Sequence, residues 1–508
     1  MPNTRTTHHL TLSPIFQNNM VIPAHKAWSV YGTSSESKQH ITAQIGDVTQ
    51  TEVTDDAGNF MITMPPLARS LDNLTLRINI VEMTSVVTSI HVGQVFLMAG
   101  QSNIEFRLQD ADTFGDTQKC LPKMKGFFYE VPQLEFQRAD GTTLPPDLPP
   151  AQWLPLDAQH VKTMSAVAFY AAERYQKTHP NEWIGIVDCY KGGTSASAWI
   201  DRALLAENPN LSSRYIQPFD AAIRGKSTAD FDRESAEFWH TVDVHDQKLK
   251  AYLAAHPTTS LSDAKNIVGH TPWPFPARPE SYLRPGGLWE TMFSPIAKFT
   301  FSAVIWYQGE NDTDQADAYD QLLTLLITSW RTQMHDRSLP FFVIQLPGYA
   351  DGQPGTWAVL RQKQMEVAQS VPFVHLISIS DTGEAHNIHP TDKRPVGYRI
   401  GRFLAGVDYP NTPMLTVTSW TNERIHLRIK WGYQFITNDP VHFTCTTARG
   451  TAEVVSVRAC ADSIVIPGNF QMFQYGYENF PKLSLFNENG DPVSPVQIRR
   501  KDYDTGVN

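Results

Sequence analysis

Val95-Phe-Leu-Met-Ala-Gly-Gln-Ser-Asn103 is the stretch that decides the fold of this chain. Residues 95–99 form a short, almost continuously apolar run, which is typical of a buried strand in a parallel sheet. Gly100 allows a sharp turn, and Ser102 follows just past the strand end, where open α/β sheets form their sites. With a helix starting behind it, a serine there can present its hydroxyl to a substrate and its N–H to an oxyanion. The alternative is that Ser102 only caps the helix, as serine commonly does.

Strand-like and helix-like runs alternate through the middle of the chain. Further buried strands are expected at 183–189, 301–307, 341–346 and 373–380, and helices at 166–177, 318–334, 357–368 and 395–405. This alternation predicts an α/β fold in which a parallel sheet is covered by helices on both faces. Four of these strands run into polar loops that contain glycine or histidine. Such loops gather at one edge of a parallel sheet, so we expect a site there.

The two ends of the chain read differently, as short strands separated by turn residues. Runs of this kind occupy residues 10–92 and return from about 412, which predicts β-sandwich-like domains at both ends. We therefore expect an N-terminal β domain at 1–92, a catalytic α/β domain at 93–410 and a C-terminal β domain at 411–508. An insertion at about 205–285 interrupts the alternation. It contains a helical run at 230–255 and the proline-rich loop 271–279, and we expect it to cover the edge of the site.

Composition excludes several classes of function. The 508 residues carry a net charge of −10, which argues against nucleic acid or an anionic membrane as the main partner. No apolar run is long enough to span a membrane. Residues 1–10 lack the apolar segment of a secretory leader, and the four scattered cysteines form no CxxC pair, so we expect a reduced, cytoplasmic protein without a zinc site.

Three more segments, each following a predicted strand, carry groups suited to acyl transfer. Gly192 and Gly193 can expose backbone N–H groups to an anion, although a tight strand-to-helix turn is the favoured explanation when the glycine pair is taken alone. The side-chain amide of Gln308 can donate to a developing oxyanion. His386 and His389 follow the last strand of the series, and a histidine at that edge is the general base that a serine nucleophile needs.

Metal-binding alternatives fit these segments less well. The two histidines, three residues apart, have no evident third ligand. Asp312, Asp314 and Asp317 lack the spacing of a calcium-binding loop, so we interpret this group of aspartates as N-capping the following helix. The sequence therefore predicts a site that uses no metal ion and no organic cofactor.

The order of the motifs narrows the class of hydrolase. No Gly-x-Ser-x-Gly motif is present, which argues against an α/β-hydrolase nucleophile elbow. An early serine, a late histidine and amide donors between them point instead to the SGNH, or GDSL, hydrolases. Nearly the whole chain resembles one family of that fold, the sialate O-acetylesterases. The matching stretches are Ser13-Pro-Ile-Phe-Gln-Asn-Asn-Met-Val21, Gly100-Gln-Ser-Asn103, Gly192-Gly-Thr194 with Trp199, Trp306-Tyr-Gln-Gly-Glu310, Trp330-Arg331, Leu339-Pro-Phe341, Gln345-Leu-Pro347, Ile388-His-Pro-x-x-Lys393, Gly397-x-Arg399 and Leu485-Phe-Asn-x-x-Gly-x-Pro492.

The resemblance implies roles for the candidate residues. Ser102 would be the nucleophile and His389 the base. The oxyanion hole would combine the N–H of Ser102, the N–H of Gly192 or Gly193, and the amide of Gln308. The remaining polar positions of these motifs would contact the substrate, namely Gln101, Asn103, Gly192 and Glu310.

One position departs from the pattern of the SGNH class. Many of these enzymes have an aspartate three residues before the histidine, where this chain has His386. Asp381 is our tentative choice for the acid that orients His389, because strand ends hold side chains more rigidly than turns do. Glu384 is the alternative, and a Ser-His dyad without an acid is a third possibility.

These observations predict a serine carboxylesterase that removes O-acetyl groups from a small-molecule sugar, with O-acetylated sialic acid as the first candidate. An acetyl esterase of plant polysaccharides such as xylan or xyloglucan is the alternative within the enzyme class. A non-catalytic carbohydrate-binding protein on an esterase scaffold is the alternative from another class, and the intact serine, glutamine and histidine argue against it.

Overall fold

The computed structural model describes residues 9–119, 124–406, 411–437 and 440–505. The chain forms two compact units. The serine unit, which contains Ser102, comprises residues 1–207, 280–306 and 325–341. The histidine unit, which contains His389, comprises residues 208–279, 307–324 and 342–508. Residues 1–8 and Cys120, on which the expectations about a leader and the cysteines partly depend, lie outside the described residues.

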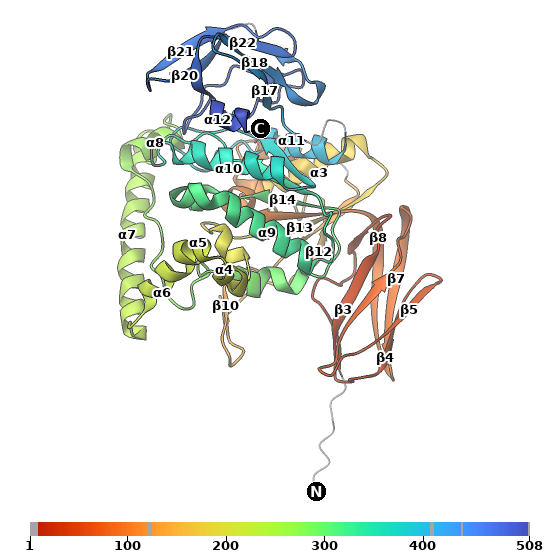
Figure 1. Cartoon of the computed structure of the whole chain (residues 1–508). Helices are drawn as coiled ribbons and strands as arrows, with labels where there is room; N and C mark the ends of the chain where they lie inside the picture. Colours follow the sequence, from red (N-terminus) through yellow and green to blue (C-terminus); the bar gives the residue numbers. More distant parts are fainter. Residues whose placement is uncertain (1–8, 120–123, 407–410, 438–439, 506–508) are drawn as a thin grey trace. The chain divides into compact units, whose positions relative to one another are not determined.

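The sheet of the serine unit confirms the predicted α/β fold (Figure 1). β13 runs parallel to both β9 and β8, and every residue of β13 after Trp183 is buried. Helix α3 (Ala166–Thr178) starts where the Ser165 hydroxyl accepts a hydrogen bond from the N–H of Ala168. The strands lie in the order β12 (Trp153–Pro155), β9 (Gly126–Glu130), β13 (Trp183–Tyr190), β8 (Met83–Gly100) and β14 (Ala303–Tyr307).

Strand β8 is 18 residues long and pairs with different strands of one sheet along its length. Its first part pairs antiparallel with β7 (Ser70–Ile80), and buried and exposed residues alternate there. Its second part pairs parallel with β13 from Gly93 to Gly100 and is almost continuously buried. This change of pattern is the one expected between a half-exposed antiparallel strand and a covered parallel strand. The domain boundary predicted at 92 thus falls inside one continuous strand.

The segment before β8 consists of short strands, as the sequence predicts. β3 pairs antiparallel with β1 and β6, while β4 pairs antiparallel with β5 and β7. The strands are β1 (Leu10–Leu12), β2 (Val21–Pro23), β3 (Trp28–Ser34), β4 (His40–Ile45), β5 (Val48–Val53) and β6 (Asn59–Met64). Short elements follow β8, namely α1 (Ser102–Glu105), α2 (Phe114–Lys119), β10 (Phe136–Gln137), β11 (Thr143–Leu144) and α4 (Arg202–Glu207).

The histidine unit contains the later strands of the α/β pattern and the insertion. Strands β15 (Phe341–Gln345) and β16 (Val374–Ser378) are neighbours, and helices α10 (Thr356–Ser370) and α11 (Arg394–Leu404) follow them along the chain. Helix α9 (Tyr319–Gln333) contributes residues 319–324 to this unit and residues 325–333 to the serine unit. The insertion is helical, with α5 (Pro209–Leu211), α6 (Gln217–Ile223), α7 (Thr228–Ala255) and α8 (Leu261–Val268).

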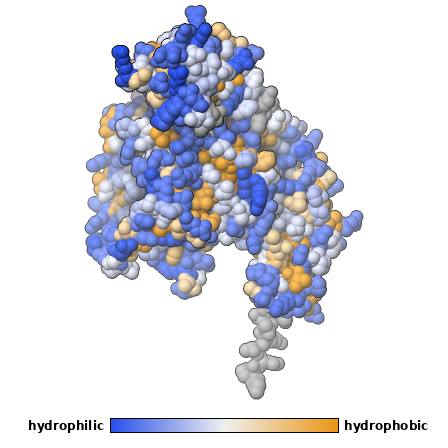
Figure 2. Space-filling view, in the orientation of Figure 1, coloured by the Kyte–Doolittle hydropathy of each residue, from blue (hydrophilic) through white to orange (hydrophobic). Residues whose placement is uncertain are grey.

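The end of the chain is rich in strands, as predicted, and belongs to the histidine unit. Buried side chains tie it to a preceding strand and helix: the amide of Gln345 on β15 donates to the hydroxyl of Ser494, and the guanidinium of Arg361 on α10 donates to the carbonyl groups of Glu478 and Asn479. In Figure 2 these strands, at the top of the view, present a mainly hydrophilic surface. No helix in the described ranges is long and apolar enough to cross a membrane. The elements are β17 (Leu415–Trp420), β18 (Arg424–Ile429), β19 (Phe435–Ile436), β20 (Val441–Thr447), β21 (Ala452–Val457), β22 (Ser463–Pro467), β23 (Phe470–Tyr475), β24 (Phe486–Asn487), β25 (Val496–Arg499) and α12 (Arg500–Asp504).

Candidate active site

Ser102 lies at the first position of the short helix α1, directly after β8. Gly100 ends the strand with a φ of 140°, a backbone conformation that side chains disfavour. The N-cap residue is Gln101, without a side-chain capping bond, so Ser102 is not the cap of this helix. Gln101 and Asn103 are buried, at 3% and 0% exposure, while Ser102 between them is only partly buried. The sharp turn therefore separates the serine from its buried neighbours, as a presented nucleophile requires.

The loop after β13 approaches Ser102 closely within the serine unit. A Cβ atom on Gly192 would lie 3.0 Å from Oε2 of Glu105 and 3.4 Å from Cβ of Ser102, so a side chain at this position would crowd the serine turn. Gly193 has a φ of 71°, which also favours glycine. The N–H of Lys191 donates to the carbonyl of Gly100 at 3.1 Å and fixes the two loops together. The serine unit thus brings Gly192 next to Ser102, as the sequence predicted for neighbouring strand ends.

Gln308 is fully buried at the end of β14, in the histidine unit, and its side chain has a defined orientation. Its Nε2 donates to Oδ2 of Asp312 at 2.7 Å, and its Oε1 accepts from the Tyr319 hydroxyl at 2.9 Å. Asp312, which we predicted as a helix cap, is 1% exposed and instead holds the Gln308 amide. The N-cap of that helical turn is Gly309. An amide held at both ends is a pre-oriented donor group, because its oxygen and nitrogen cannot exchange places without losing both bonds.

His389 lies in a loop whose backbone is fixed by Asn387. The Nδ2 of Asn387 donates to the carbonyl of His389 at 2.7 Å, and its Oδ1 accepts from the N–H of His389 at 3.3 Å. Glu384 supports this arrangement, since its Oε2 accepts from Nδ2 of Asn387 and its Oε1 accepts from the N–H of Thr391. Glu384, our alternative choice for the orienting acid, therefore uses both oxygen atoms to hold the loop.

Two lysine side chains act electrostatically on the imidazole of His389. Burial, together with the positive charges of Lys393 and Lys265, lowers the pKa of His389 to about 3. Burial also lowers the pKa of Lys393, which is 1% exposed, to about 7, although the charges of Glu310 and Glu384 partly offset this effect. His389 is consequently neutral at physiological pH, the state in which an imidazole can accept a proton. Glu310, predicted to contact substrate, is buried and acts electrostatically on Lys393.

Asp381 has a different partner from the one we predicted. Its two carboxylate oxygens accept hydrogen bonds from Nη1 and Nη2 of Arg399 at 2.9 and 3.0 Å. Arg399 lies on α11, and its Nε also donates to the buried Asp491 at 2.9 Å. A bidentate ion pair of this kind fixes the end of β16 to α11. Both oxygens of Asp381 are engaged by this guanidinium, and the tentative assignment of Asp381 as the orienting acid stays a prediction.

Helix α8 of the insertion contacts the histidine loop directly. The Ser262 hydroxyl accepts from the N–H of His386 at 3.0 Å, and Nζ of Lys265 donates to Oδ1 of Asn387 at 2.8 Å. His386 itself contacts Oδ1 of Asp351 through Nδ1 at 2.8 Å. Sequence reasoning placed the insertion at the edge of the site but missed Lys265 and Asn387. The motif Ile388-His-Pro directly after Asn387 was the available signal for Asn387, whereas nothing in the sequence distinguished Lys265.

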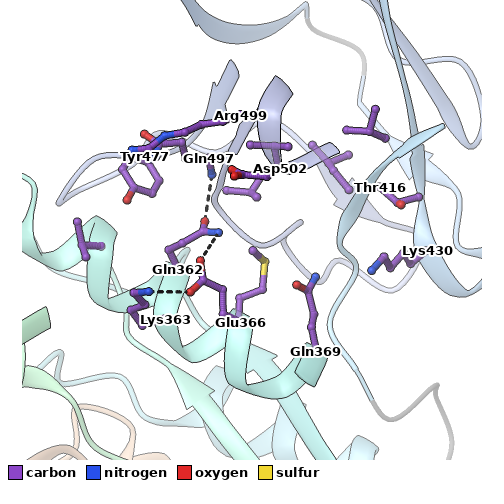
Figure 3. A pocket seen from close by; sticks show the side chains of 16 residues that line it. Gln362, Lys363, Glu366, Gln369, Thr416, Lys430, Tyr477, Gln497, Arg499 and Asp502 are labelled. Atoms are coloured by element: carbon purple, nitrogen blue, oxygen red, sulfur yellow. Dashed lines mark hydrogen bonds and ion pairs between the residues drawn. The ribbon is translucent and has the colours of Figure 1, made fainter. Parts of the chain in front are cut away.

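A cavity of about 430 Å³ in the histidine unit lies apart from these groups (Figure 3). It is lined by α10, β17 and β25, and none of the candidate catalytic residues borders it. A series of hydrogen bonds runs along its wall from the N–H of Gln497 to Gln362, from Gln362 to Glu366 and from Lys363 to Glu366. These bonds join the C-terminal strands to α10, so we interpret the cavity as a crevice between packed elements.

Known carbohydrate esterases are similar to this chain in sequence. A model of the family described as carbohydrate esterase, sialic acid-specific acetylesterase, matches residues 281–405, which include Gln308 and His389. The sialate O-acetylesterase of Rattus norvegicus is 25% identical over 390 residues, or 71% of this chain and 65% of the relative. The resemblance to the sialate O-acetylesterase family is confirmed.

A second sequence match and one solved structure are also similar to this chain. The sialate O-acetylesterase of Mus musculus is 29% identical over 144 residues, or 24% of this chain and 26% of the relative. The chain therefore spans just under two thirds of the rat sialate O-acetylesterase and about a quarter of the mouse enzyme. A carbohydrate acetylesterase from Xanthomonas citri has a similar crystal structure, with a TM-score of 0.72, 21% identity, and coverage of 96% of this chain and 99% of that chain. This likeness confirms the fold class: the chain is similar in structure to a carbohydrate acetylesterase.

Proposed function

We propose that this chain is a serine carboxylesterase that removes O-acetyl groups from sugars, with O-acetylated sialic acid as the preferred substrate class. The observation that carries the proposal is the position of Ser102. This serine is partly exposed between two buried residues, at a turn that Gly192 approaches closely. The match of residues 281–405 to the sialic acid-specific acetylesterases supports the choice of substrate.

The proposed reaction has two halves. Oγ of Ser102 attacks the acetyl carbonyl carbon while His389 takes the hydroxyl proton. The oxyanion accepts hydrogen bonds from the N–H of Ser102, the N–H of Gly193 and the amide of Gln308. When the intermediate collapses, the C–O bond to the sugar breaks and His389 returns the proton to the sugar oxygen. Water, deprotonated by His389, then cleaves the acetyl-serine, which releases acetate and restores the hydroxyl of Ser102.

We propose that His389 works without a dedicated acid. The carboxylate oxygens of Asp381 accept hydrogen bonds from Arg399, and those of Glu384 accept from the loop itself. The side chain of Asn387 holds the backbone of His389. The lowered pKa of His389 keeps it neutral and ready to accept a proton. Gln101, Asn103, Gly192 and Glu310 are proposed to shape the surroundings of the acetyl group.

Labelling with a fluorophosphonate followed by peptide mass spectrometry tests the nucleophile. We expect the label on Ser102 and its loss in Ser102→Ala. The substrate class is tested by kcat/KM for O-acetylated sialic acid, acetylated xylan and nitrophenyl acetate. Equal or greater kcat/KM for acetylated xylan would move the assignment to the polysaccharide esterases. Absence of label together with absence of hydrolysis of all three esters would contradict the proposal as a whole.

A further inference from the structure

The insertion carries a group of aromatic side chains that the proposed chemistry does not use. Trp273 in the proline-rich loop is 48% exposed, and Trp239 on α7 is 54% exposed. Exposed tryptophans are costly to keep in contact with water, since each ring offers a large apolar area. A partly exposed ring that is also held in place is therefore a candidate for ligand contact.

Trp273 is attached to the loop that carries Gln308. Its indole Nε1 donates to Oδ1 of Asn311 at 2.9 Å, and Asn311 follows Gln308 by three residues in the same unit. The indole satisfies its only polar group through this bond, and about half of the residue stays exposed to solvent. The anchoring point places Trp273 beside the Gln308 loop.

Contacts with helix α7 also hold the loop around Trp273 in place. The ring of Phe275 contacts Phe238 edge-on at 5.4 Å and Trp239 at 5.7 Å, both on α7. Nη2 of Arg278 lies 3.7 Å from Oδ1 of Asp232 on the same helix. Prolines at 272, 274 and 276 restrict the backbone between these anchors. A rigid loop loses little conformational entropy when a ligand binds, which favours a binding role.

We propose that Trp273 is the sugar-binding platform of the enzyme, on which the apolar C–H face of the substrate's pyranose ring stacks. This inference rests on the proposed function. A sugar ring offers one face of C–H groups and a periphery of hydroxyls, and an exposed indole beside polar groups is complementary to it. The role of Trp273 is to select the sugar that carries the acetyl group, whereas the acyl chemistry belongs to other residues.

Two ester substrates separate sugar binding from chemistry. Nitrophenyl acetate delivers the same acetyl group without a sugar, and O-acetylated sialic acid or an acetylated xylo-oligosaccharide delivers it with one. In Trp273→Ala we expect KM for the acetylated sugar to rise roughly tenfold or more, the size of a single good aromatic contact. The kcat/KM for nitrophenyl acetate should stay within about twofold. Phe373→Ala is the matched control, since Phe373 is an exposed aromatic residue at 55% outside the insertion.

Further variants distinguish stacking from anchoring. Trp273→Phe keeps a ring but loses the bond to Asn311, and Trp273→Leu keeps apolar bulk without a ring. Stacking predicts a small effect in the first variant and a large one in the second. Equal losses for both esters in all three variants would instead mean that Trp273 only supports the Gln308 loop, and the inference would be wrong. If wild-type protein hydrolyses neither ester, the proposed function fails first, and this result is distinct from hydrolysis of both esters with no selective effect at Trp273.

Discussion

At the scale of the residue, Ser102 combines limited burial with a turn that leaves it outside the core. Ser102→Ala should therefore leave the melting temperature nearly unchanged while kcat falls on the order of 10³-fold or more, because nucleophile and base act as one unit. The check is kcat on nitrophenyl acetate beside thermal unfolding. Ser85→Ala, in the same strand β8 and away from the turn, is the control. A folded Ser102→Ala protein with near-wild-type turnover would exclude the serine mechanism.

The two carboxylates near His389 should respond differently from the acid of a catalytic triad. In Asp381→Asn the guanidinium of Arg399, only 8% exposed in its side chain, loses a bidentate partner. We expect a lower melting temperature and more than about a tenth of wild-type kcat/KM, compared with the roughly 10⁴-fold loss typical of a triad acid. Glu384→Gln should reduce activity moderately, by loosening the loop around Asn387. A loss near 10⁴-fold in Asp381→Asn at unchanged melting temperature would restore Asp381 as the orienting acid.

Individual residues also show where sequence reasoning succeeds and where it stops. The turn at Ser102 was predictable, because an apolar run followed by glycine fixes a strand end and its direction. The partners of Asp381 and Glu384 were not, because Arg399 and Thr391 approach them only through tertiary folding. The sequence shows that a carboxylate lies close to a histidine along the chain. Which hydrogen-bond donor that carboxylate binds depends on all the donors that the folded protein brings near it.

At the scale of the element, strand β8 carries a buried histidine with an unusual environment. His91 is 3% exposed and packs against the rings of Phe127 and Trp183, with centroids at 4.9 and 3.9 Å. Burial lowers the pKa of His91 to about 4. In the unfolded chain the group titrates near 6.5, so its stabilising effect is complete above pH 6.5 and is lost as pH falls towards 4.

This environment predicts acid sensitivity of the serine unit. The loss attributable to His91 should reach about 3 kcal/mol at pH 4. His91→Phe keeps a ring packed against the two aromatic neighbours but cannot take up a proton, so it should shift the acid-unfolding midpoint to lower pH. The measurement is tryptophan fluorescence against pH, with the solvent-exposed His40→Phe as control. Identical acid-unfolding curves for wild type and His91→Phe would show that His91 does not limit stability.

Helix α8 predicts a shift in the pH–rate profile. Lys265 is one of the two positive charges that lower the pKa of His389. Lys265→Gln removes that charge, so the pKa of His389 should rise and the acidic limb of kcat/KM should move to higher pH. We expect a shift of about half a pH unit to one unit. Lys250→Gln, on the exposed face of α7, should leave the profile in place. A profile unchanged by Lys265→Gln would mean that this charge does not reach His389.

The sequence predicted helices with strong hydrophobic periodicity well, but it did not predict which elements they contact. The expected helices at 166–177 and 395–405 agree within a residue with α3 and α11, because buried faces and caps mark their ends. Helix α8 docks through Ser262 and Lys265, polar side chains that any solvated helix could carry. The sequence therefore supported the existence of the insertion and its general place, but not its contact with Asn387.

At the scale of the whole molecule, the candidate residues are divided between two units. Ser102 and Gly193 belong to the serine unit, and Gln308 and His389 belong to the histidine unit. The C-terminal strands are part of the histidine unit, with the fully buried Arg361 and the nearly buried Arg399 both bonded to residues beyond 477. They are thus a structural component of the unit that carries the proposed base.

Truncation tests this conclusion. A chain ending at residue 411 would leave Arg361 and Arg399 without their C-terminal acceptors, and buried charges that lose partners are strongly destabilising. We expect such a chain to be insoluble or to lack the cooperative unfolding transition of the histidine unit, as measured by soluble yield and circular dichroism. A chain ending at 504, after α12, should behave like wild type. A soluble 411-residue chain with the wild-type melting temperature would refute the structural role of the C-terminal strands.

The dependence of Arg361 on the last strands also sets an order of events during synthesis. All segments of the serine unit have been translated once residue 341 is made, whereas the histidine unit waits for β25 at 496–499. The interval of roughly 160 residues corresponds to about 10 to 30 seconds of translation at usual rates. For that time the nascent chain carries every segment of the serine unit, together with helix α10 without its C-terminal partners. A ribosome that stops anywhere in this interval leaves a chain that contains the proposed nucleophile while the unit that holds the proposed base is still incomplete.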